Sequence, residues 1–257
     1  MTKKNIKKEF IDAQIAAFSQ NSRQNELLIR HQKIISLICK YVPVDATILD
    51  IGCYDGVILK ALEKKGYQHL YGIDFSETSK KSFAKTSIHF AQCDVEQEAI
   101  PFNKKFDLVI FTDVLEHFFS PQSVLFELKK KLAPDAKIIF SVPNAGWFLN
   151  GFLLSFLPSK LFLSTAFGPW GHTYQFTFYQ ASKMAGNLKF KLIELTGTKM
   201  DNYAFKTGFK KAAYDVFSTM QYLPALAYPQ IFSAHIFGVF QNTSAQLTKK
   251  AHFELGE

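Results

Sequence analysis

Short apolar runs alternate with amphipathic stretches through the middle of this chain. The apolar runs are rich in β-branched and aromatic residues, which is typical of buried strands. They predict strands at 47–51, 69–74, 88–92, 106–111 and 137–142, and two closing strands at 190–195 and 231–240. The amphipathic stretches repeat apolar residues at helical spacing. They predict helices at 24–41, 56–65 and 76–85, and one that begins at Ser120-Pro121 and ends at 133–135.

Strands that alternate with helices are typical of a parallel sheet covered by helices on both faces. We therefore expect an α/β fold with a three-layer, doubly wound, seven-stranded and mostly parallel sheet. The expected organisation is a basic tail and capping helix over 1–41, the sheet domain over 42–242 and a tail over 243–257. Two apolar, aromatic insertions interrupt the alternation at 147–171 and 200–230. They would either cover the ligand side of the sheet or add core packing.

The first predicted strand runs into a glycine turn, TILDIGCYDG, at 47–56. Gly52 and Gly56 would let a ligand lie against the backbone, and Asp55 can cap the next helix. Asp74 ends the second strand, at a spacing that suits a carboxylate bound to ribose hydroxyls. A strand, a glycine turn and a helix start favour a nucleoside-bearing ligand at the carboxyl end of the sheet. A dinucleotide and S-adenosylmethionine both fit this outline.

The dinucleotide fits less well, because its pyrophosphate needs small residues where this chain has Tyr54 and Val57. S-adenosylmethionine carries no phosphate, so Asp50, Gly52 and Gly56 suffice. Here the chain resembles the class I S-adenosylmethionine-dependent methyltransferases, whose first motif reads roughly D-x-G-x-G-x-G. Tyr54 departs from that motif at the middle glycine.

Four segments carry the resemblance, over roughly residues 24–198 and the final strand: ILDIGCYDG, YGID, FDLVIFTDVLEHFFSP and IIFSVPN. The last two are similar to a bacterial subgroup that includes ubiquinone-type O-methyltransferases and enzymes of surface-glycan biosynthesis. The family's sheet ends in an antiparallel edge, so the resemblance implies an antiparallel last strand.

The resemblance also implies a cofactor site at successive strand ends. Asp50 would hold the ammonium of the methionine part, Asp74 the two ribose hydroxyls and Asp94 the adenine amino group. Asp113 would line the methionine end of the cofactor or the acceptor pocket. Three of them have plainer alternatives: Asp50 as an internal hydrogen-bond anchor, Asp74 as a helix cap and Asp94 as a turn residue. The implied cofactor set is Asp50, Gly52, Cys53, Tyr54, Gly56, Asp74, Phe75, Asp94, Val95 and Asp113.

Two histidines are candidate catalytic bases, since a histidine can accept a hydroxyl proton near neutral pH. His117 matches the histidine of the family's L-E-H segment, and His172 lies in GHTYQFTF after the first insertion. Either could instead be structural. Arg30 either meets the cofactor's methionine carboxylate or lies solvated on an exposed helix face. The other five histidines are expected at the surface or at sheet edges: His31, His69, His89, His235 and His252.

Composition narrows the partners. The 257 residues carry a net charge of +8, but only Arg23 and Arg30 are arginines. Base and phosphate recognition prefer arginine, so nucleic acid is not expected as a substrate. The three cysteines are scattered and odd in number. They indicate a reduced, cytoplasmic protein and lack metal-ligand spacing, so we expect no metal.

We therefore expect an enzyme that transfers the methyl group of S-adenosylmethionine to a small-molecule acceptor. The acceptor atom would be an oxygen of a glycan, a lipid-linked compound or a quinone-like compound. One rival is a non-catalytic binding or regulatory subunit of the same fold, and another is a nicotinamide oxidoreductase. Peripheral contact of 147–171 with the inner membrane surface stays open. Neither half of that segment reaches the ~20 apolar residues of a membrane span.

Overall fold

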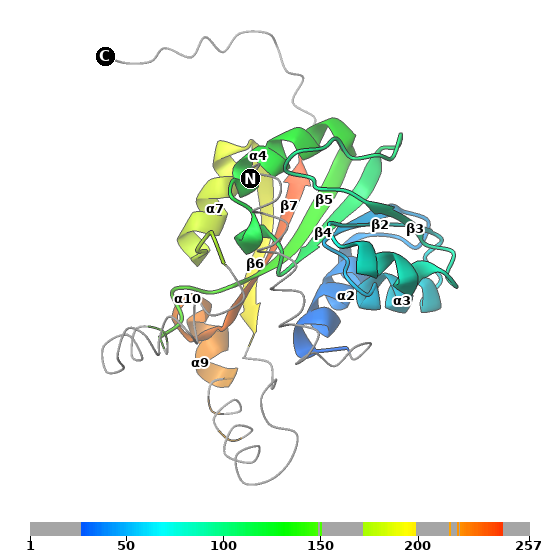
Figure 1. Cartoon of the computed structure of the whole chain (residues 1–257). Helices are drawn as coiled ribbons and strands as arrows, with labels where there is room; N and C mark the ends of the chain where they lie inside the picture. Colours follow the sequence, from blue (N-terminus) through cyan, green and yellow to red (C-terminus); the bar gives the residue numbers. More distant parts are fainter. Residues whose placement is uncertain are drawn as a thin grey trace, which may run out of the picture.

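The computed structural model describes residues 27–148, 150, 172–198, 216, 220 and 222–243. They contain a seven-stranded sheet with helices on both faces (Figure 1). The strands are β1 (Thr47–Ile51), β2 (His69–Asp74), β3 (His89–Gln92), β4 (Phe106–Thr112), β5 (Leu132–Pro143), β6 (Phe190–Thr198) and β7 (His235–Asn242). The α-helices are α2 (Ile29–Tyr41), α3 (Val57–Lys64), α4 (Pro121–Leu128), α7 (Phe178–Asn187), α9 (Tyr222–Ala227) and α10 (Pro229–Phe232).

The strand order is β3-β2-β1-β4-β5-β7-β6. Strands β1 to β5 pair in parallel, and β7 runs antiparallel to both β5 and β6. The chain starts at the centre of the sheet, moves outward through β2 and β3, and returns to β4 beside β1. This reversal is the switch point at which open α/β sheets bind ligands. The predicted fold class and antiparallel last strand are confirmed.

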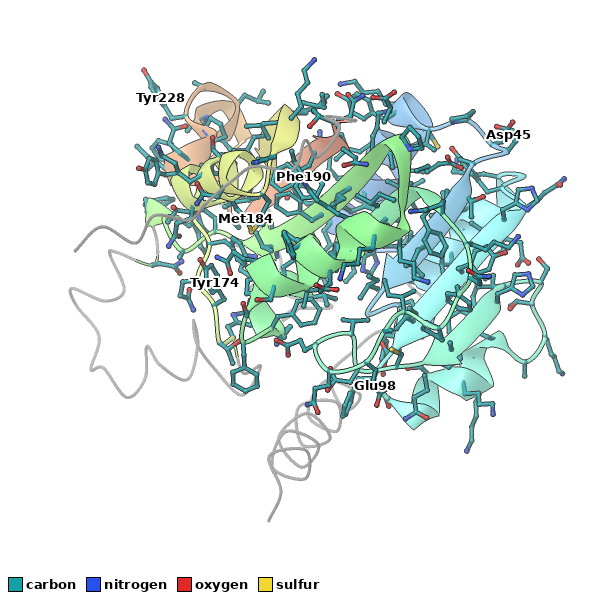
Figure 2. All side chains as sticks on the ribbon, turned by 90° about the horizontal axis from the view of Figure 1, so that it is seen from above. Asp45, Glu98, Tyr174, Met184, Phe190 and Tyr228 are labelled. Atoms are coloured by element: carbon teal, nitrogen blue, oxygen red, sulfur yellow. The ribbon has the colours of Figure 1, made fainter. Side chains whose placement is uncertain are left out.

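Both faces of the sheet are buried, which explains the near-continuous apolar runs. Ile48 and Ile110 belong to a cluster that includes apolar side chains of α2 and α3. Leu49 and Val109, one position along, belong to a second cluster with side chains of α4 and α7. Met184 of α7, labelled in Figure 2, lies in the second cluster. The alternation of side chains along each strand therefore produces the three layers.

One predicted helix is wrong in type, and several predicted boundaries are wrong. Residues 77–83 of the second predicted helix form a 3₁₀ helix, η1 (Glu77–Phe83), in place of an α-helix. The helix α4 ends at Leu128, and a second 3₁₀ turn, η3 (Lys129–Lys131), leads directly into β5.

Residues 133–135 therefore lie within β5, where Asp135 takes a φ of 59° beside an irregularity in the β4–β5 pairing. The last strand begins at His235, because Pro229 favours a helical turn at 229–232.

Most of the two predicted insertions, 147–171 and 200–230, lies outside the described residues, so their covering roles stay predictions. The helices α9 and α10 belong to the end of the second insertion. Within the described part of the chain, no helix combines the length and apolar character needed to cross a membrane.

The turn between β1 and α3 depends on two glycines. Gly52 and Gly56 both take a φ of 75°, a left-handed conformation that costs other residues energy. A Cβ on Gly56 would lie 2.5 Å from a ring carbon of Phe83, and one on Gly52 would collide with Val114. The N-cap of α3 is Gly56, so the prediction that Asp55 caps this helix is wrong by one position. Asp55 Oδ1 still accepts a hydrogen bond from the Val57 N–H at 3.2 Å.

Gly56→Ala should therefore lower the free energy of unfolding by about 2–4 kcal/mol, from backbone strain and the Phe83 contact together. Gly66→Ala is the matched control, because Gly66 follows α3 at a φ of 94°, and an added Cβ there would meet no described atom within 4 Å. It should cost only about 1–2 kcal/mol. Urea unfolding of both variants checks this, and equal losses would contradict the packing role of Phe83.

Candidate active site

Hydrogen bonds join the glycine turn after β1 to the end of β2. The Ile73 carbonyl accepts from the N–H groups of Gly52 at 2.8 Å and Cys53 at 3.1 Å. The Asp74 carboxylate accepts from the Tyr54 N–H and the Ser76 N–H, each at 2.8 Å. Asp74 is thus the anchor of the turn, and each of its oxygens keeps a lone pair for a further donor.

Asp74 is only 8% exposed. Burial raises its pKa above the ordinary value, although the backbone hydrogen bonds from Ser76 and Tyr54 oppose that rise. The structure therefore shows that Asp74 anchors the turn, and the predicted ribose contact stays a prediction.

Asp50 lies within β1 beside this turn and is 3% exposed. Its Oδ1 atom has no hydrogen-bond partner among the described residues. Burial raises the pKa of Asp50 well above its ordinary value, and the nearby charges of Asp74 and Asp55 raise it further. A buried acceptor without a donor is costly, so this position suits a cationic or hydrogen-bonding ligand group.

The other predicted cofactor residues fall close to the same edge of the sheet. Asp94 follows β3, is buried, and caps its own turn by accepting from the Glu96 N–H at 3.1 Å. Phe75 and Val95 are half-buried beside the ends of β2 and β3. Tyr54 takes a φ of 46° in the turn. Cofactor contact by these residues stays a prediction.

The Cys53 side chain faces the core, where it packs with apolar residues of α2 and α3. A Cβ on Gly72 would approach its Sγ atom to 2.8 Å, which shows how tightly the thiol is enclosed. The predicted cofactor contact of Cys53 would therefore involve its backbone and not its thiol.

Beyond β4, an ion pair joins α2 to the sheet. Arg30 Nε lies 2.7 Å from Asp113 Oδ2, and Ser141 Oγ donates to Asp113 Oδ1 at 2.6 Å. Arg30 is 6% exposed, so the predicted solvated position on an exposed helix face is wrong. Its charge is accommodated in this buried position because Asp113 is its partner.

Asp113 takes a φ of 52°, a conformation that aspartate and asparagine tolerate better than most residues. Burial alone would raise its pKa, but the charge of Arg30, followed by His235 and the Ser141 hydrogen bond, lowers the pKa below the ordinary value. Asp113 is therefore ionised at neutral pH, whereas Asp50 is held toward its neutral form.

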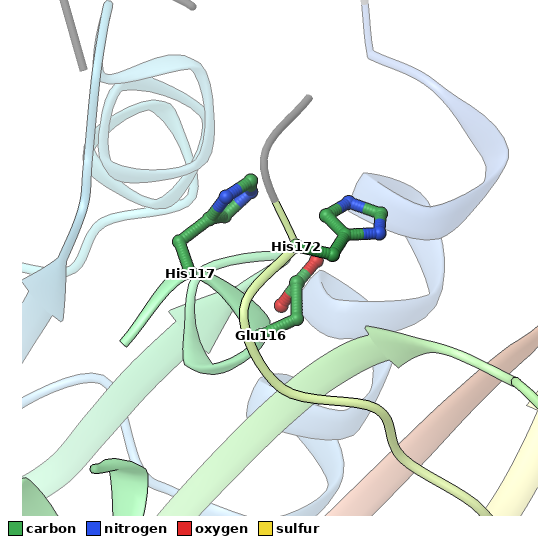
Figure 3. Close-up of side chains that lie close together, drawn as sticks. All are labelled: Glu116, His117 and His172. Carbon is green, nitrogen blue, oxygen red and sulfur yellow. The ribbon is translucent and has the colours of Figure 1, made fainter. Parts of the chain in front are cut away.

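The two predicted catalytic histidines lie side by side, although 54 residues separate them in the sequence. Glu116 and His117 belong to a 3₁₀ turn, η2 (Leu115–His117), and His172 begins the segment that leads to α7 (Figure 3). The His117 and His172 ring centroids are 5.1 Å apart at 69°. Burial, followed by the charge of His117, lowers the pKa of His172 to about 4.

Glu116 completes this group and is 2% exposed. Burial raises its pKa well above the ordinary value, and the charge of Asp113 adds to the rise. Both carboxylate oxygens lack a hydrogen-bond partner in the part of the chain that the structure describes.

The sequence alone did not indicate some of the residues around Asp113 and the two histidines. Ser141 is a lone polar residue in an apolar strand, which could have indicated its bond to Asp113. His235 was expected at the surface or an edge, but it is half-buried in β7 and its charge acts on Asp113. Glu116 stands beside His117 in the sequence, but its burial could not be read from the motif.

The seven-stranded sheet with its antiparallel last strand is the fold of the class I S-adenosylmethionine-dependent methyltransferases. Residues 19–190 match the family model described as a methyltransferase domain. The chain belongs to this family.

Curated relatives agree with that membership. The chain is 28% identical over 145 residues to the ubiquinone biosynthesis O-methyltransferase of Hydrogenovibrio crunogenus, covering 54% of this chain and 58% of that protein. It is 29% identical over 126 residues to the corresponding protein of Colwellia psychrerythraea, covering 46% and 50%. The chain thus spans about half the length of the curated relatives it matches.

Solved structures share the fold at lower identity. A methyltransferase from Mesorhizobium loti superimposes with a TM-score of 0.56 at 14% identity, over 83% of this chain and 98% of that one. The plantazolicin methyltransferase BpumL, in complex with a pentazolic desmethylPZN analogue and S-adenosylhomocysteine (SAH), gives a TM-score of 0.57 at 16% identity over 90% of each chain. The predicted family and its cofactor class, S-adenosylmethionine, are confirmed.

Arg30→Met should lower the free energy of unfolding by about 3 kcal/mol at pH 7, because it leaves a buried carboxylate without its partner. Asp113 has a lowered pKa in the folded protein, so its contribution is present above its ordinary pKa of ~3.9 and lost as pH falls through the folded value. In the variant, Asp113 protonates at a higher pH. The difference between wild type and variant should therefore shrink on acidification.

Urea unfolding at pH 7 and pH 5 measures this difference. Arg30→Met combined with Asp113→Asn is the control, since asparagine is neutral and tolerates the φ of 52°. The double variant should recover most of the lost stability. Equal stability of wild type and Arg30→Met at pH 7 would show that the ion pair contributes nothing.

Proposed function

We propose that this chain transfers a methyl group from S-adenosylmethionine to an oxygen atom of a small-molecule acceptor. One observation carries the proposal: the glycine turn and the buried carboxylates of Asp50, Asp74 and Asp94 meet at the carboxyl ends of adjacent parallel strands. Family membership makes S-adenosylmethionine the ligand that such a site would take.

The residues fit that cofactor. The unpartnered Asp50 oxygen suits its ammonium, Asp74 its ribose hydroxyls and Asp94 its adenine amino group. The bound cofactor supplies a methyl group on a sulfonium that is already activated. The chain's main contribution is then to align the acceptor and exclude water, which can lower a barrier by on the order of 7–11 kcal/mol.

The acceptor is proposed to lie beside Asp113, His117 and His172, past the end of β4. A base that removes a hydroxyl proton contributes roughly 10²–10⁴-fold to a rate. His117 is the better candidate for that base, because a pKa of about 4 makes His172 a weak base at neutral pH. His172 would then act as a neutral hydrogen-bond partner of the acceptor.

The curated relatives named ubiquinone biosynthesis O-methyltransferases support oxygen as the acceptor atom and a quinone-like acceptor. The apolar insertion at 147–171 is consistent with an acceptor that carries an apolar portion, such as a lipid-linked compound.

Calorimetric titration with SAH tests the proposal. Asp74→Ala should weaken binding by about 1–3 kcal/mol, because the ribose hydroxyls lose their acceptor. Asp107→Ala is the matched control, since Asp107 also accepts a backbone N–H, from Thr47 at 2.8 Å, but at the opposite edge of the sheet. Because Asp107 lies at the amino ends of β1 and β4, away from the glycine turn, Asp107→Ala should leave SAH binding unchanged.

If wild type failed to bind SAH, a non-catalytic role would replace this proposal. If Asp74→Ala bound SAH as tightly as Asp107→Ala, the proposed contact of Asp74 with the ribose would be wrong.

His117→Ala should lower the rate of methyl transfer by roughly 10²–10⁴-fold and leave SAH affinity unchanged. Transfer of a labelled methyl group to a quinol or catechol acceptor measures the rate. His89→Ala is the control, because His89 stacks on Tyr71 at the far edge strand β3. A drop of less than tenfold for His117→Ala would remove this residue from the base role.

A further inference from the structure

We propose that Glu116, His117 and His172 bind one divalent transition-metal ion. The ligand atoms of these three side chains all lie within 4.8 Å of one another (Figure 3). In a tetrahedral zinc site with bonds of about 2.0–2.1 Å, ligand atoms stand roughly 3.3 Å apart. Small side-chain rotations would therefore bring the three groups into coordination distance of one ion.

The backbone holds the two contributing segments together. The Glu116 carbonyl accepts from the Thr173 N–H at 2.8 Å and the Tyr174 N–H at 3.0 Å. Thr173 Oγ1 donates to the Phe118 carbonyl at 2.8 Å. His172 is thereby fixed beside the 3₁₀ turn that carries Glu116 and His117. The three ligands come from positions that the fold has already joined.

Glu116 supplies an independent indication of a missing ligand. It is 2% exposed, and neither carboxylate oxygen has a donor among the described residues. The nearby guanidinium of Arg30 is paired with Asp113 at 2.7 Å. Burying a carboxylate without a donor or cation costs several kcal/mol, because its hydration is lost. A metal ion bound by Glu116 and the two imidazoles would remove that cost.

The ligand types indicate which ions fit. Two imidazoles and one carboxylate suit Zn²⁺, Fe²⁺, Co²⁺ or Ni²⁺, whereas Mg²⁺ and Ca²⁺ prefer oxygen ligands throughout. Three protein ligands leave at least one coordination position open, as in catalytic zinc sites. That position would take a water molecule or an oxygen of the acceptor, and only its use by the acceptor rests on the proposed function. A metal-bound imidazole has no lone pair left to accept a proton, so His117 would be the base only in the metal-free protein. With the ion bound, the ion itself would lower the pKa of an acceptor hydroxyl or of a bound water molecule.

The expectation of no metal was drawn from the cysteines, which lack metal-ligand spacing. The cluster proposed here contains no cysteine. His172 lies 55 residues after His117 and 56 after Glu116, so no short sequence motif contains all three ligands.

Titration of the chelator-treated, tag-free full chain with Co²⁺ tests the site, because cobalt bound in a low-symmetry site gives visible absorption bands. We expect one Co²⁺ per chain and displacement of those bands by Zn²⁺. Glu116→Gln and His172→Ala should each weaken Co²⁺ binding at least tenfold. His69→Ala and Cys39→Ser are controls, because both side chains are exposed and lie away from the cluster. They should bind like wild type.

The proposal is overturned if wild type binds Co²⁺ no more tightly than Glu116→Gln and His172→Ala. Far-UV circular dichroism shows whether each variant folds. If Glu116→Gln does not fold, His172→Ala is the deciding variant, because His172 is only half-buried and its loss should disturb the fold less. SAH titration of the metal-free protein separates the two proposals. Loss of the metal site would leave SAH binding intact, whereas failure of the proposed function would abolish SAH binding with or without metal.

Discussion

The attachment of the first glycine turn to the end of β2 is the constraint on which the candidate site depends. Two backbone N–H groups bond to the Ile73 carbonyl, and one bonds to the Asp74 carboxylate. These bonds fix where β1 ends, where α3 begins and where Asp74 points. Gly52 and Gly56 are required because the turn adopts positive φ and has side chains of neighbouring elements against it. A ligand at this turn would meet a preformed surface.

The same sheet places the acids at its strand ends in different electrostatic settings. Burial raises the pKa values of Asp50 and Asp74, and no cationic side chain of the described residues offsets that rise. Asp113 is also buried, but Arg30 lowers its pKa. Titratable groups pushed in opposite directions are typical of sites with distinct chemical roles. The ends of β1 to β3 thus suit a cationic, hydroxyl-rich cofactor, and the end of β4 carries a fixed negative charge.

Much of this arrangement could be predicted from the sequence, because local signals and topology agree. The apolar runs predicted five parallel strands in the right places, and the glycine turn and Asp74 fell at the predicted strand ends. The failures have physical causes. The burial of Arg30 was missed because its partner Asp113 is distant in sequence, and the proposed metal cluster was missed because tertiary hydrogen bonds bring His172 to Glu116. Pairing across long sequence separations has no local signature.

A crystal structure of the chain with SAH bound would decide whether the glycine turn and Asp74 hold the adenosyl group. We expect the adenosyl group against the Gly52–Gly56 turn, with the ribose hydroxyls on the Asp74 carboxylate and the ligand's amino group on Asp50. A structure with Asp74 still bonded only to the Tyr54 and Ser76 N–H groups, and SAH bound elsewhere, would contradict it.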